Sequence, residues 1–355
     1  MMTILTSIAL LVMNQILMSK KYNFLVLTDH SGHSQENSVY ALMAKLAQQP
    51  ECGKLSVASR GNHANDDFFQ NYQATTLLAI NAGSDFCFDA SGKQFSENAA
   101  LVNIADYEVI IMRLPRPISS KFLNFVAEIG QDKVIINHPK GIESTGTKAF
   151  LLNFPEVCPS IRLCHSIEEI MAFAKQFPIV LKPLREYGGK GILKIEGDIL
   201  NDGNNDFDTI TYLQNIKNYI ETEGFLAMEF LKNVYQGDKR ILVVNGQILA
   251  SSLRLPAKNS WLCNIAQGGR SVPTEVTPEE IKIIETISPT LLEAGILIFG
   301  ADTLVANDGK RILSEVNTLS IGGFPQAERL TGRPILQQTI NAVIQHVNTV
   351  FQNQK

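Results

Sequence analysis

The chain has 355 residues, which is enough for two or three domains with buried cores. Its net charge is −4 without a basic run, which argues against a nucleic-acid partner. Its five scattered cysteines form no Cys-x-x-Cys or Cys/His cluster. That pattern argues against a disulfide framework or a zinc site, and it favours a reducing compartment, which we expect to be the cytoplasm.

The first 17 residues are apolar and contain no lysine or arginine. They lack the basic start and the small-residue cleavage site of a secretory signal, and they are short for a membrane span. We expect Met18 to be the true start and residues 1–17 to be an extra segment. A weak hydrophobic leader or anchor is the alternative. We expect no membrane partner.

Residues 18–139 alternate short apolar runs with segments of helical periodicity. Strands are predicted at 24–28, 55–59, 109–112 and 134–136, helices at 38–48 and 122–129, and a hairpin at 86–95. This pattern predicts an open parallel α/β sheet, whose ligands bind beyond the carboxyl ends of the strands. Arg113 and Arg116 follow one such end and could hold a substrate carboxylate, although arginines there are often only surface residues.

From residue 140 the pattern changes to α+β, and we divide it into 140–232 and 233–355. The first part is predicted to hold strands at 179–184, 192–195 and 225–231, a helix at 211–222 and an Asn/Asp-rich loop at 198–208. The second part is predicted to hold hairpins at 238–254 and 299–317, a loop at 256–270, and helices at 278–294 and 336–350.

Lys182 lies within the apolar run Ile-Val-Leu-Lys-Pro-Leu, where solvation is poor, so it needs an anionic partner. The phosphates of a nucleotide would serve, and an internal ion pair is the alternative. Gly188 and Gly189 follow in a strand-to-strand segment whose backbone could approach phosphate oxygens. The segment is not a Walker A motif, and such a glycine pair can be a simple turn.

The run from Leu226 to Leu231 is apolar except for Glu229. Its backbone could meet an adenine edge while Met228 and Leu231 pack on the ring. An ordinary core strand with one charge at its edge is the alternative.

The hairpin at 299–317 carries oxygen ligands on one face. Glu315 and Asn317 are two residues apart and should point the same way, and Asp302 on the partner strand can reach the same side. Two carboxylates and an amide oxygen suit Mg²⁺ bound to a nucleotide. A surface hairpin with merely solvated charges is the alternative.

These pieces occur in one order along the chain. The most specific are Asn137-His-Pro leading to Lys148, Leu181-Lys-Pro-Leu with Gly188-Gly189, Gly237-Asp-Lys-Arg-Ile-Leu, Gln267-Gly-Gly-Arg, and Phe299-Gly-Ala-Asp followed by Ser314-Glu-Val-Asn. Together they resemble the ATP-grasp ligases, and most closely the prokaryotic glutathione synthetase family, over about residues 20–350. The resemblance implies an ATP-grasp fold preceded by an open parallel α/β N-terminal domain.

The resemblance also implies roles for residues at matching positions. Nucleotide-binding residues would be Lys148, Lys182, Gly188, Gly189, Met228, Glu229, Leu231 and Asp238; catalytic residues would be Arg240, Arg254, Asn264 and Arg270; Mg²⁺ or Mn²⁺ ligands would be Asp302, Glu315 and Asn317; and the peptide substrate would meet Arg113 and Arg116. The implied reaction is an ATP-dependent joining of an acid and an amine through an acyl phosphate. The implied assembly is a homo-oligomer.

Two departures bear on the substrate. The chain has Leu262-Cys263-Asn264 where these synthetases usually carry Arg-Gly-Asn, and Thr318 to Pro325 replaces their usual Val-Thr-Ser-Pro-Thr. Synthesis of glutathione from γ-glutamylcysteine and glycine is the expected activity. The rivals are a ligase of the same fold for another acid and amine, and a non-catalytic ATP-binding module. Arginines placed for a γ-phosphate argue against the module.

Overall fold

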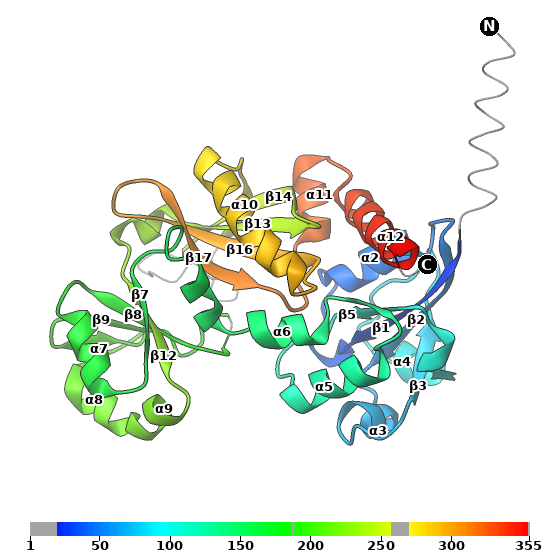
Figure 1. Ribbon diagram of the computed structural model, residues 1–355, viewed down its shortest axis with the longest axis horizontal. Coiled ribbons are helices and arrows are strands. Elements are labelled where there is room, and N and C mark those ends of the chain that lie inside the picture. Colours follow the sequence, from blue (N-terminus) through cyan, green and yellow to red (C-terminus); the bar gives the residue numbers. More distant parts are fainter. Residues whose placement is uncertain (1–19, 187, 257–269, 354–355) are drawn as a thin grey trace, which may run out of the picture. The chain divides into compact units, whose positions relative to one another are not determined.

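The structure is a computed structural model that describes residues 20–186, 188–256 and 270–353. Its contacts divide these residues into two units (Figure 1). Unit 1 holds the described residues up to Pro139, together with Gly322–Gln326 and those from Pro334 onward. Unit 2 holds Lys140–Ile321 and Ala327–Arg333. The C-terminal helix therefore belongs to unit 1, whereas the sequence grouped it with residues 233–355.

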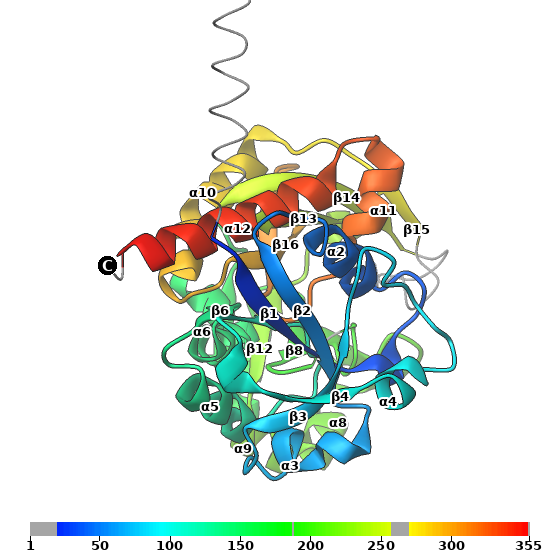
Figure 2. The same ribbon diagram turned by 90° about the vertical axis from the view of Figure 1, so that its right-hand side faces the viewer.

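Unit 1 is built on a six-stranded sheet with the order β4-β3-β2-β1-β5-β6 (Figure 2). Its strands are β1 Tyr22–Thr28, β2 Cys52–Ser59, β3 Thr76–Asn81, β4 Ala100–Asn103, β5 Val109–Met112 and β6 Val134–Ile136. The four strands β2, β1, β5 and β6 pair in parallel, and β3 and β4 join antiparallel at one edge. The parallel part is as predicted, and the antiparallel edge was not foreseen.

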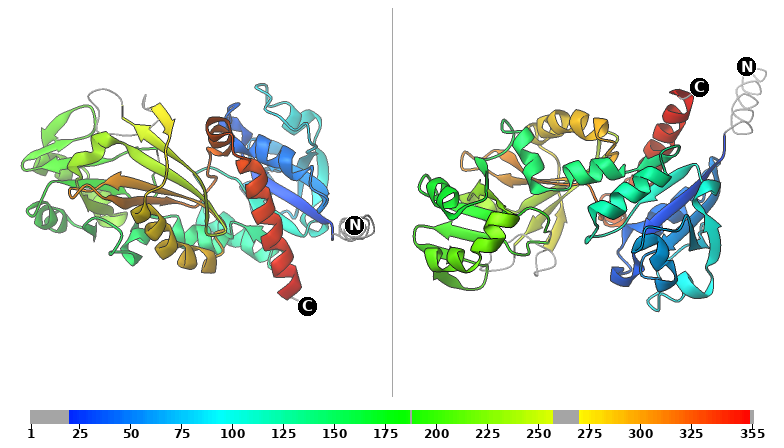
Figure 3. Two further views of the ribbon diagram at one scale, coloured as in Figure 1. Left: turned by 90° about the horizontal axis from the view of Figure 1, so that it is seen from above. Right: turned by 60° about the horizontal axis from the view of Figure 1, so that its bottom comes forward.

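The helices of unit 1 supply apolar faces for this sheet. They are α2 Ser38–Leu46, α3 Asp66–Phe69, α4 Gln94–Glu97, α5 Ser120–Ile129 and α12 Ile335–Asn353. The N-terminus of α2 is capped by the Asn37 side chain, which accepts from the Val39 N–H at 3.0 Å. Helix α12 contacts α2 (Figure 3). The Phe351 ring of α12 stacks on Tyr22 of β1 with centroids 5.1 Å apart, so the last helix is tied to the first strand.

The predicted hairpin at 86–95 is wrong. This segment contains turns and the start of α4, and the strand pair of this region is β3 with β4. Its aromatic residues pack locally: Phe86 contacts Tyr40, and Phe95 stacks on His30 with ring centroids 4.5 Å apart. Alternating apolar residues are typical of a strand, but here local ring contacts bury them and no strand forms.

Unit 2 begins with an antiparallel sheet, here called the first sheet of unit 2, with the order β11-β10-β9-β8-β12-β7. Its strands are β7 Ile161–Cys164, β8 Ile179–Pro183, β9 Leu193–Glu196, β10 Ile199–Asn201, β11 Asp206–Asp208 and β12 Phe225–Glu229. Its helices are α7 Ile167–Ala174, α8 Thr209–Asn215 and α9 Lys217–Thr222. A buried apolar cluster joins the helices to the sheet and includes Ile170, Leu181, Leu213 and Ile220.

The predicted loop at 198–208 is instead the hairpin of β10 and β11. Its polar residues form the turn, because the Asp202 carboxylate accepts from the N–H groups of Asn204 and Asn205 at 2.9 and 2.8 Å. The predicted single helix at 211–222 is divided into α8 and α9.

The second part of unit 2 is the C-terminal sheet, with the order β15-β14-β13-β16-β17. Its strands are β13 Asp238–Val244, β14 Gln247–Leu255, β15 Arg270–Pro273, β16 Ile298–Val305 and β17 Arg311–Asn317. Helix α10 Pro278–Glu293 lies across it (Figure 1). Two of the unit boundaries fall within helices, namely α6 Pro139–Thr145 and α11 Phe324–Thr331. Among the described residues, no helix has both the length and the apolar content that crossing a bilayer requires.

Candidate functional site

A cavity of about 300 Å³ in unit 2 is lined by residues of both its sheets. The lining residues are Val180, Lys182, Gly188, Gly189, Ile192, Met228, Glu229, Phe230, Leu231, Val234, Asp238, Arg240, Arg254, Asp302, Leu304, Ser314, Glu315 and Asn317. This volume is at the lower end of the range of small-molecule sites. The lining divides into an apolar part and a charged part.

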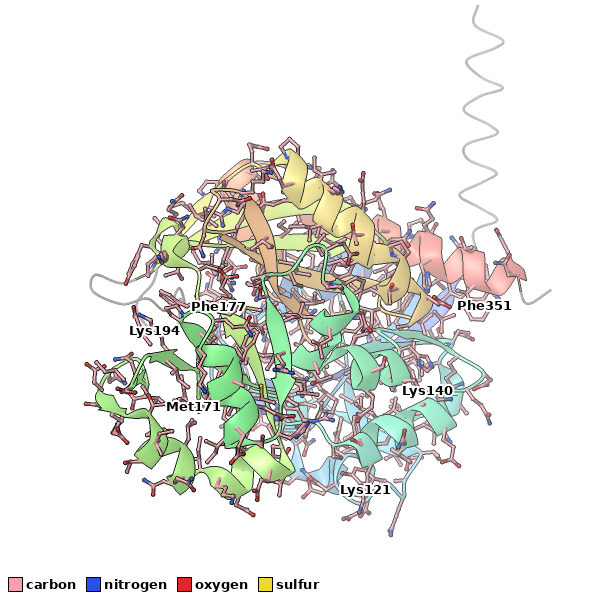
Figure 4. All side chains as sticks on the ribbon, turned by 60° about the vertical axis from the view of Figure 1, so that its left-hand side comes forward. Lys121, Lys140, Met171, Phe177, Lys194 and Phe351 are labelled. Carbon is pink, nitrogen blue, oxygen red and sulfur yellow. The ribbon has the colours of Figure 1, made fainter. Side chains whose placement is uncertain are left out.

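The apolar part follows β12 and the segment after it. Met228 and Leu231 are nearly fully buried, at 1% and 4% exposure, and Phe230 lies between them in the sequence. The ammonium of Lys194, labelled in Figure 4, lies 4.3 Å from the Phe230 ring centroid. This wall offers flat apolar surface next to backbone polar groups.

Lys182 connects the two sheets. Its side chain is buried, and its ammonium donates to the Ser314 carbonyl of β17 at 3.0 Å. Burial lowers the pKa of Lys182, and Lys148 adds to that effect while Glu315 opposes it. Ser314 is the extra residue of a β-bulge, since Asp302 pairs with Glu315 whereas Thr303 pairs with Leu313. The bulge disrupts the ladder locally at the residue whose carbonyl Lys182 uses.

The glycine segment after β8 has left-handed backbone at Gly188 and Gly189, with φ of 68° and 75°. Residues with a Cβ rarely adopt such values, so glycine is required here for the chain to line the cavity. Lys148 is also close, because its ammonium donates to the carbonyl of Glu186 in the same segment.

The charged part lies on one face of the C-terminal sheet. Antiparallel pairing sets Arg254 opposite Asp238, Asp302 opposite Arg240, and Glu315 opposite Asp302. Directly paired residues share a face, so the sheet brings these side chains together. Asn317 lies two residues beyond Glu315 and lines the same cavity.

Ion pairs link these side chains. Arg240 binds both carboxylate oxygens of Asp302, with Nε–Oδ1 at 2.6 Å and Nη2–Oδ2 at 2.5 Å. Arg254 contacts Asp302 Oδ2 at 2.9 Å and also donates to Asp238. Asn317 donates its amide N–H to Asp302 Oδ2 at 3.1 Å. Asp302 is thus the centre of the cluster.

The charges shift one another's protonation. Burial opposes the ionisation of Asp302, but Arg240 and Arg254 hold its pKa below the usual range. Burial and the Asp302 carboxylate raise the pKa of Asp238. Burial also opposes the charge of Arg254, yet Asp302 and Asp238 raise its pKa, so it stays protonated. Asp238 Oδ1 and Arg254 Nε are buried without a hydrogen-bond partner among the described residues.

The donor set fits a hard divalent cation in its chemistry. Asp302, Glu315 and Asn317 offer two carboxylates and an amide oxygen, and magnesium takes oxygen ligands of this kind while keeping waters and phosphates. In the part of the chain that the structure describes, no group of three or more His, Cys, Asp or Glu side chains is arranged to hold a metal. The proposed set has two such side chains and relies on the amide.

Several predicted site residues lie elsewhere. Arg113 and Arg116 belong to unit 1, outside the unit that holds the cavity. Arg113 is buried, which lowers its pKa to about 10. Asn264 lies outside the described residues, and Arg270 opens β15 but its side chain is not described.

The sequence reasoning missed several lining residues, namely Val180, Ile192, Phe230, Val234, Leu304 and Ser314. Strand alternation would have found Val180, because it is two residues from Lys182 on β8. Ser314 had no such signal, because a bulge depends on the pairing of two strands.

Comparison with known proteins decides the family. The model of the prokaryotic glutathione synthetase ATP-grasp domain matches residues 147–332, a range that includes the whole lining of the cavity. The chain belongs to this family. A glutathione synthetase of Bradyrhizobium diazoefficiens is 29% identical over 244 residues, covering 67% of this chain and 73% of the relative. One of Prochlorococcus marinus is 30% identical over 242 residues, covering 67% and 74%.

Solved structures agree on the fold. A D-cycloserine synthetase matches with a TM-score of 0.60 at 8% identity, covering 92% of this chain and 100% of that one. The ADP complex of an N5-carboxyaminoimidazole ribonucleotide synthetase matches with a TM-score of 0.56 at 11% identity, covering 91% and 77%. This member of the glutathione synthetase family is therefore an ATP-dependent carbon–nitrogen ligase with an ATP-grasp fold.

Proposed function

We propose that the chain joins γ-glutamylcysteine and glycine, at the expense of ATP, to form glutathione. The observation that carries the proposal is that an apolar wall, a buried lysine and a cluster of two arginines with carboxylates line one cavity. The family match and the curated glutathione synthetase relatives support the choice of substrates.

ATP would lie along the cavity from its apolar part to its charged part. Met228 and Leu231 would pack on the adenine, with Glu229 at its edge. Lys182 and Lys148 would neutralise phosphate charge, and the left-handed glycines would let their backbone approach the phosphate oxygens.

Asp302, Glu315 and Asn317 would hold Mg²⁺ or Mn²⁺. The bound ion would neutralise charge on the phosphate tail of ATP and hold its oxygens in place. Asp302 is suited to this role because its neighbouring arginines keep it ionised. Asp238 is bonded to Arg254 of the same cluster, and one of its carboxylate oxygens is buried without a partner among the described residues. Its charge would add to that of the proposed metal ligands.

Arg240 and Arg254 would act on the transferred phosphoryl group. Phosphoryl transfer depends mainly on positioning and on neutralising charge as it develops. Both guanidinium groups are already oriented by carboxylates and line the cavity. Arg270, the first residue of β15, and Asn264 would complete the proposed set of catalytic residues.

The reaction would proceed in two balanced steps. A carboxylate oxygen of the dipeptide attacks the γ-phosphorus, the bond to the β-phosphate oxygen breaks, and ADP leaves. The glycine amine then attacks the carbonyl of the acyl phosphate, phosphate leaves, and the nitrogen loses a proton. Acyl phosphates hydrolyse readily, so this chemistry requires a site closed to water. Arg113 and Arg116 of unit 1 would bind the peptide substrate.

The test is the release of ADP and phosphate from ATP with defined pairs of acid and amine. Release should require both γ-glutamylcysteine and glycine, and glutathione should accumulate in equal amount. Release with other pairs only would point to a different ligase of this fold. Absence of turnover with every pair tested would favour an ATP-binding module.

A further inference from the structure

The tip of the β16–β17 hairpin is hydrogen-bonded to the segment that follows β12. The Asn307 amide nitrogen donates to the Glu229 carboxylate at 2.8 Å, and its oxygen accepts from the Lys232 backbone N–H at 3.0 Å. Asn233 donates from its side chain to the Ala306 carbonyl at 2.7 Å. One side chain thus bridges two points of residues 229–233, here called the linker.

The turn that carries Asn307 is itself fixed. Ala306 and Lys310 are joined by a backbone hydrogen bond of 2.8 Å, and the Gly309 N–H donates to the Ala306 carbonyl at 3.0 Å. Gly309 has a φ of 88°, which favours glycine there. The Asp308 carboxylate accepts from the Lys310 N–H at 3.0 Å. A turn held this way presents Asn307 with little freedom.

The linker borders the apolar wall of the cavity. Met228, Glu229, Phe230 and Leu231 all line it. Without Asn307, the Glu229 carboxylate and the Lys232 N–H would be two polar groups free to turn toward a ligand. With Asn307, both are already bonded, so Asn307 holds the linker through the Glu229 side chain and the Lys232 backbone. The backbone N–H groups of Glu229 and Phe230 donate separately to the carbonyls of Ser160 and Pro178, at 2.9 and 2.8 Å, which leaves the Lys232 end as the part of the backbone that Asn307 fixes.

We infer that Asn307 is a positioning residue for the base of the nucleotide. It holds the linker in the conformation that selects adenine over other bases. This inference rests on the proposed nucleotide site. Recognition of a base edge needs a backbone donor and acceptor at a fixed spacing, and a mobile linker would accept several bases with less affinity for each. The hairpin that carries the proposed metal ligands would then also control base selection at its other end.

The experiment begins with Asn307→Ala, which removes both bonds. ADP titration should show binding weakened about tenfold, the effect of losing one or two net hydrogen bonds. KM for ATP should rise similarly while kcat at saturation stays within about twofold, and the preference for ATP over GTP should fall. The control is Asp308→Ala, which removes one side-chain bond of the same turn but none to the linker. The backbone bonds of Ala306 with Gly309 and Lys310 still fix the turn, so ADP binding should stay within about twofold of the wild type.

A paired exchange isolates the contact with Glu229. Asn307→Asp sets two carboxylates against each other and should weaken ADP binding more than Asn307→Ala. In a Glu229→Gln background a donor faces the new carboxylate, so Asn307→Asp should cost less there than in the wild type. An equal or larger cost in that background would overturn the inference.

Four further results bear on the inferred role of Asn307. Unchanged ADP binding and base preference in Asn307→Ala would overturn it, as would a parallel fall in kcat and melting temperature, which indicates general loss of structure. If the wild type binds ADP but ligates no γ-glutamylcysteine, the proposed reaction fails, and the inference is still judged by the ADP titrations. If the wild type does not bind ADP, both fail.

Discussion

The two faces of the C-terminal sheet carry similar charges in different settings. Lys239 and Arg240 are neighbours on β13 and point to opposite faces. Lys239 donates to Glu280 of α10 at 2.6 Å and to the Glu275 carbonyl at 2.7 Å, and Thr303 donates to the other Glu280 oxygen at 2.6 Å. Glu280 is fully buried. These hydrogen bonds of Lys239, Glu280 and Thr303 all join one protein group to another.

On the face toward the cavity, by comparison, the charged side chains are not fully buried and not fully hydrogen-bonded. Its ion pairs are partly exposed, with side-chain exposure of 23% for Arg240 and 14% for Arg254. Asp238 Oδ1 and Arg254 Nε have no partner among the described residues. A satisfied buried group stabilises and specifies a fold, whereas unsatisfied groups at a cavity are candidates for ligand binding. One face of the sheet thus carries a buried charged group bonded within the protein, and the other is the face at which we propose the chemistry.

The largest expected effect is on the face beneath α10. Lys239→Met should lower the free energy of unfolding by about 3–5 kcal/mol, because it removes the cation that lies 2.6 Å from the buried Glu280 carboxylate and leaves only the more distant Arg311 guanidinium, at 3.9 Å. Denaturant titration measures the loss. Adding Glu280→Gln should recover part of it. A loss under about 1 kcal/mol in the single variant would mean that this face is not a stability element.

A smaller effect is expected on the other face, and it should fall on activity. Glu315→Gln should reduce kcat/KM by about 10²–10³, because one charged ligand of the proposed metal site becomes neutral. The free energy of unfolding should change little, since Glu315 is only half-buried. Wild-type turnover in this variant would remove the metal assignment and the contrast between the faces.

Removal of divalent cations should affect activity at the cavity face and leave the stability of the α10 face unchanged, and it needs no mutation. Treatment with EDTA should abolish ADP release, and added Mg²⁺ should restore it, because the proposed carboxylate and amide ligands act through an ion. The apo protein should unfold at nearly the same denaturant concentration, because the Lys239–Glu280 pair involves no ion. Turnover that persists in EDTA would contradict the proposal.

The smallest expected effect comes from Thr303→Val. This change removes the hydroxyl that donates to Glu280 but keeps the shape of the side chain, so it should cost about 1–2 kcal/mol of stability. Asp302 is the preceding residue and faces the cavity, yet kcat/KM of the folded enzyme should be unchanged. A loss of activity without a loss of stability would show that the two faces are coupled.

Sequence reasoning was strongest where local patterns agree with the fold. The two long hairpins of the C-terminal sheet, α10 and the strand that carries Lys182 lie where periodicity and turn residues predicted them. Asp302, Glu315 and Asn317 line one cavity, as strand alternation indicated. These features depend on residues close together in the chain.

The remainder depended on contacts between distant segments. The pairing of β3 with β4, the bulge at Ser314 and the bond from Asn307 to Glu229 each require knowing which strands or turns are neighbours. The partner of Lys182 illustrates the limit. Its burial demanded a partner, and the sequence allowed an anion, whereas the structure supplies the Ser314 carbonyl.

The bulge at Ser314 also determines which way the end of β17 faces. Leu313 and Glu315 are two residues apart and would share a face in a regular strand. The extra residue separates them, so Leu313 pairs with Thr303 while Glu315 pairs with Asp302. Deleting that one residue would leave both pairings possible and would withdraw the carbonyl from Lys182. The extra residue therefore links the register of the hairpin to the carbonyl that accepts from the buried Lys182 ammonium.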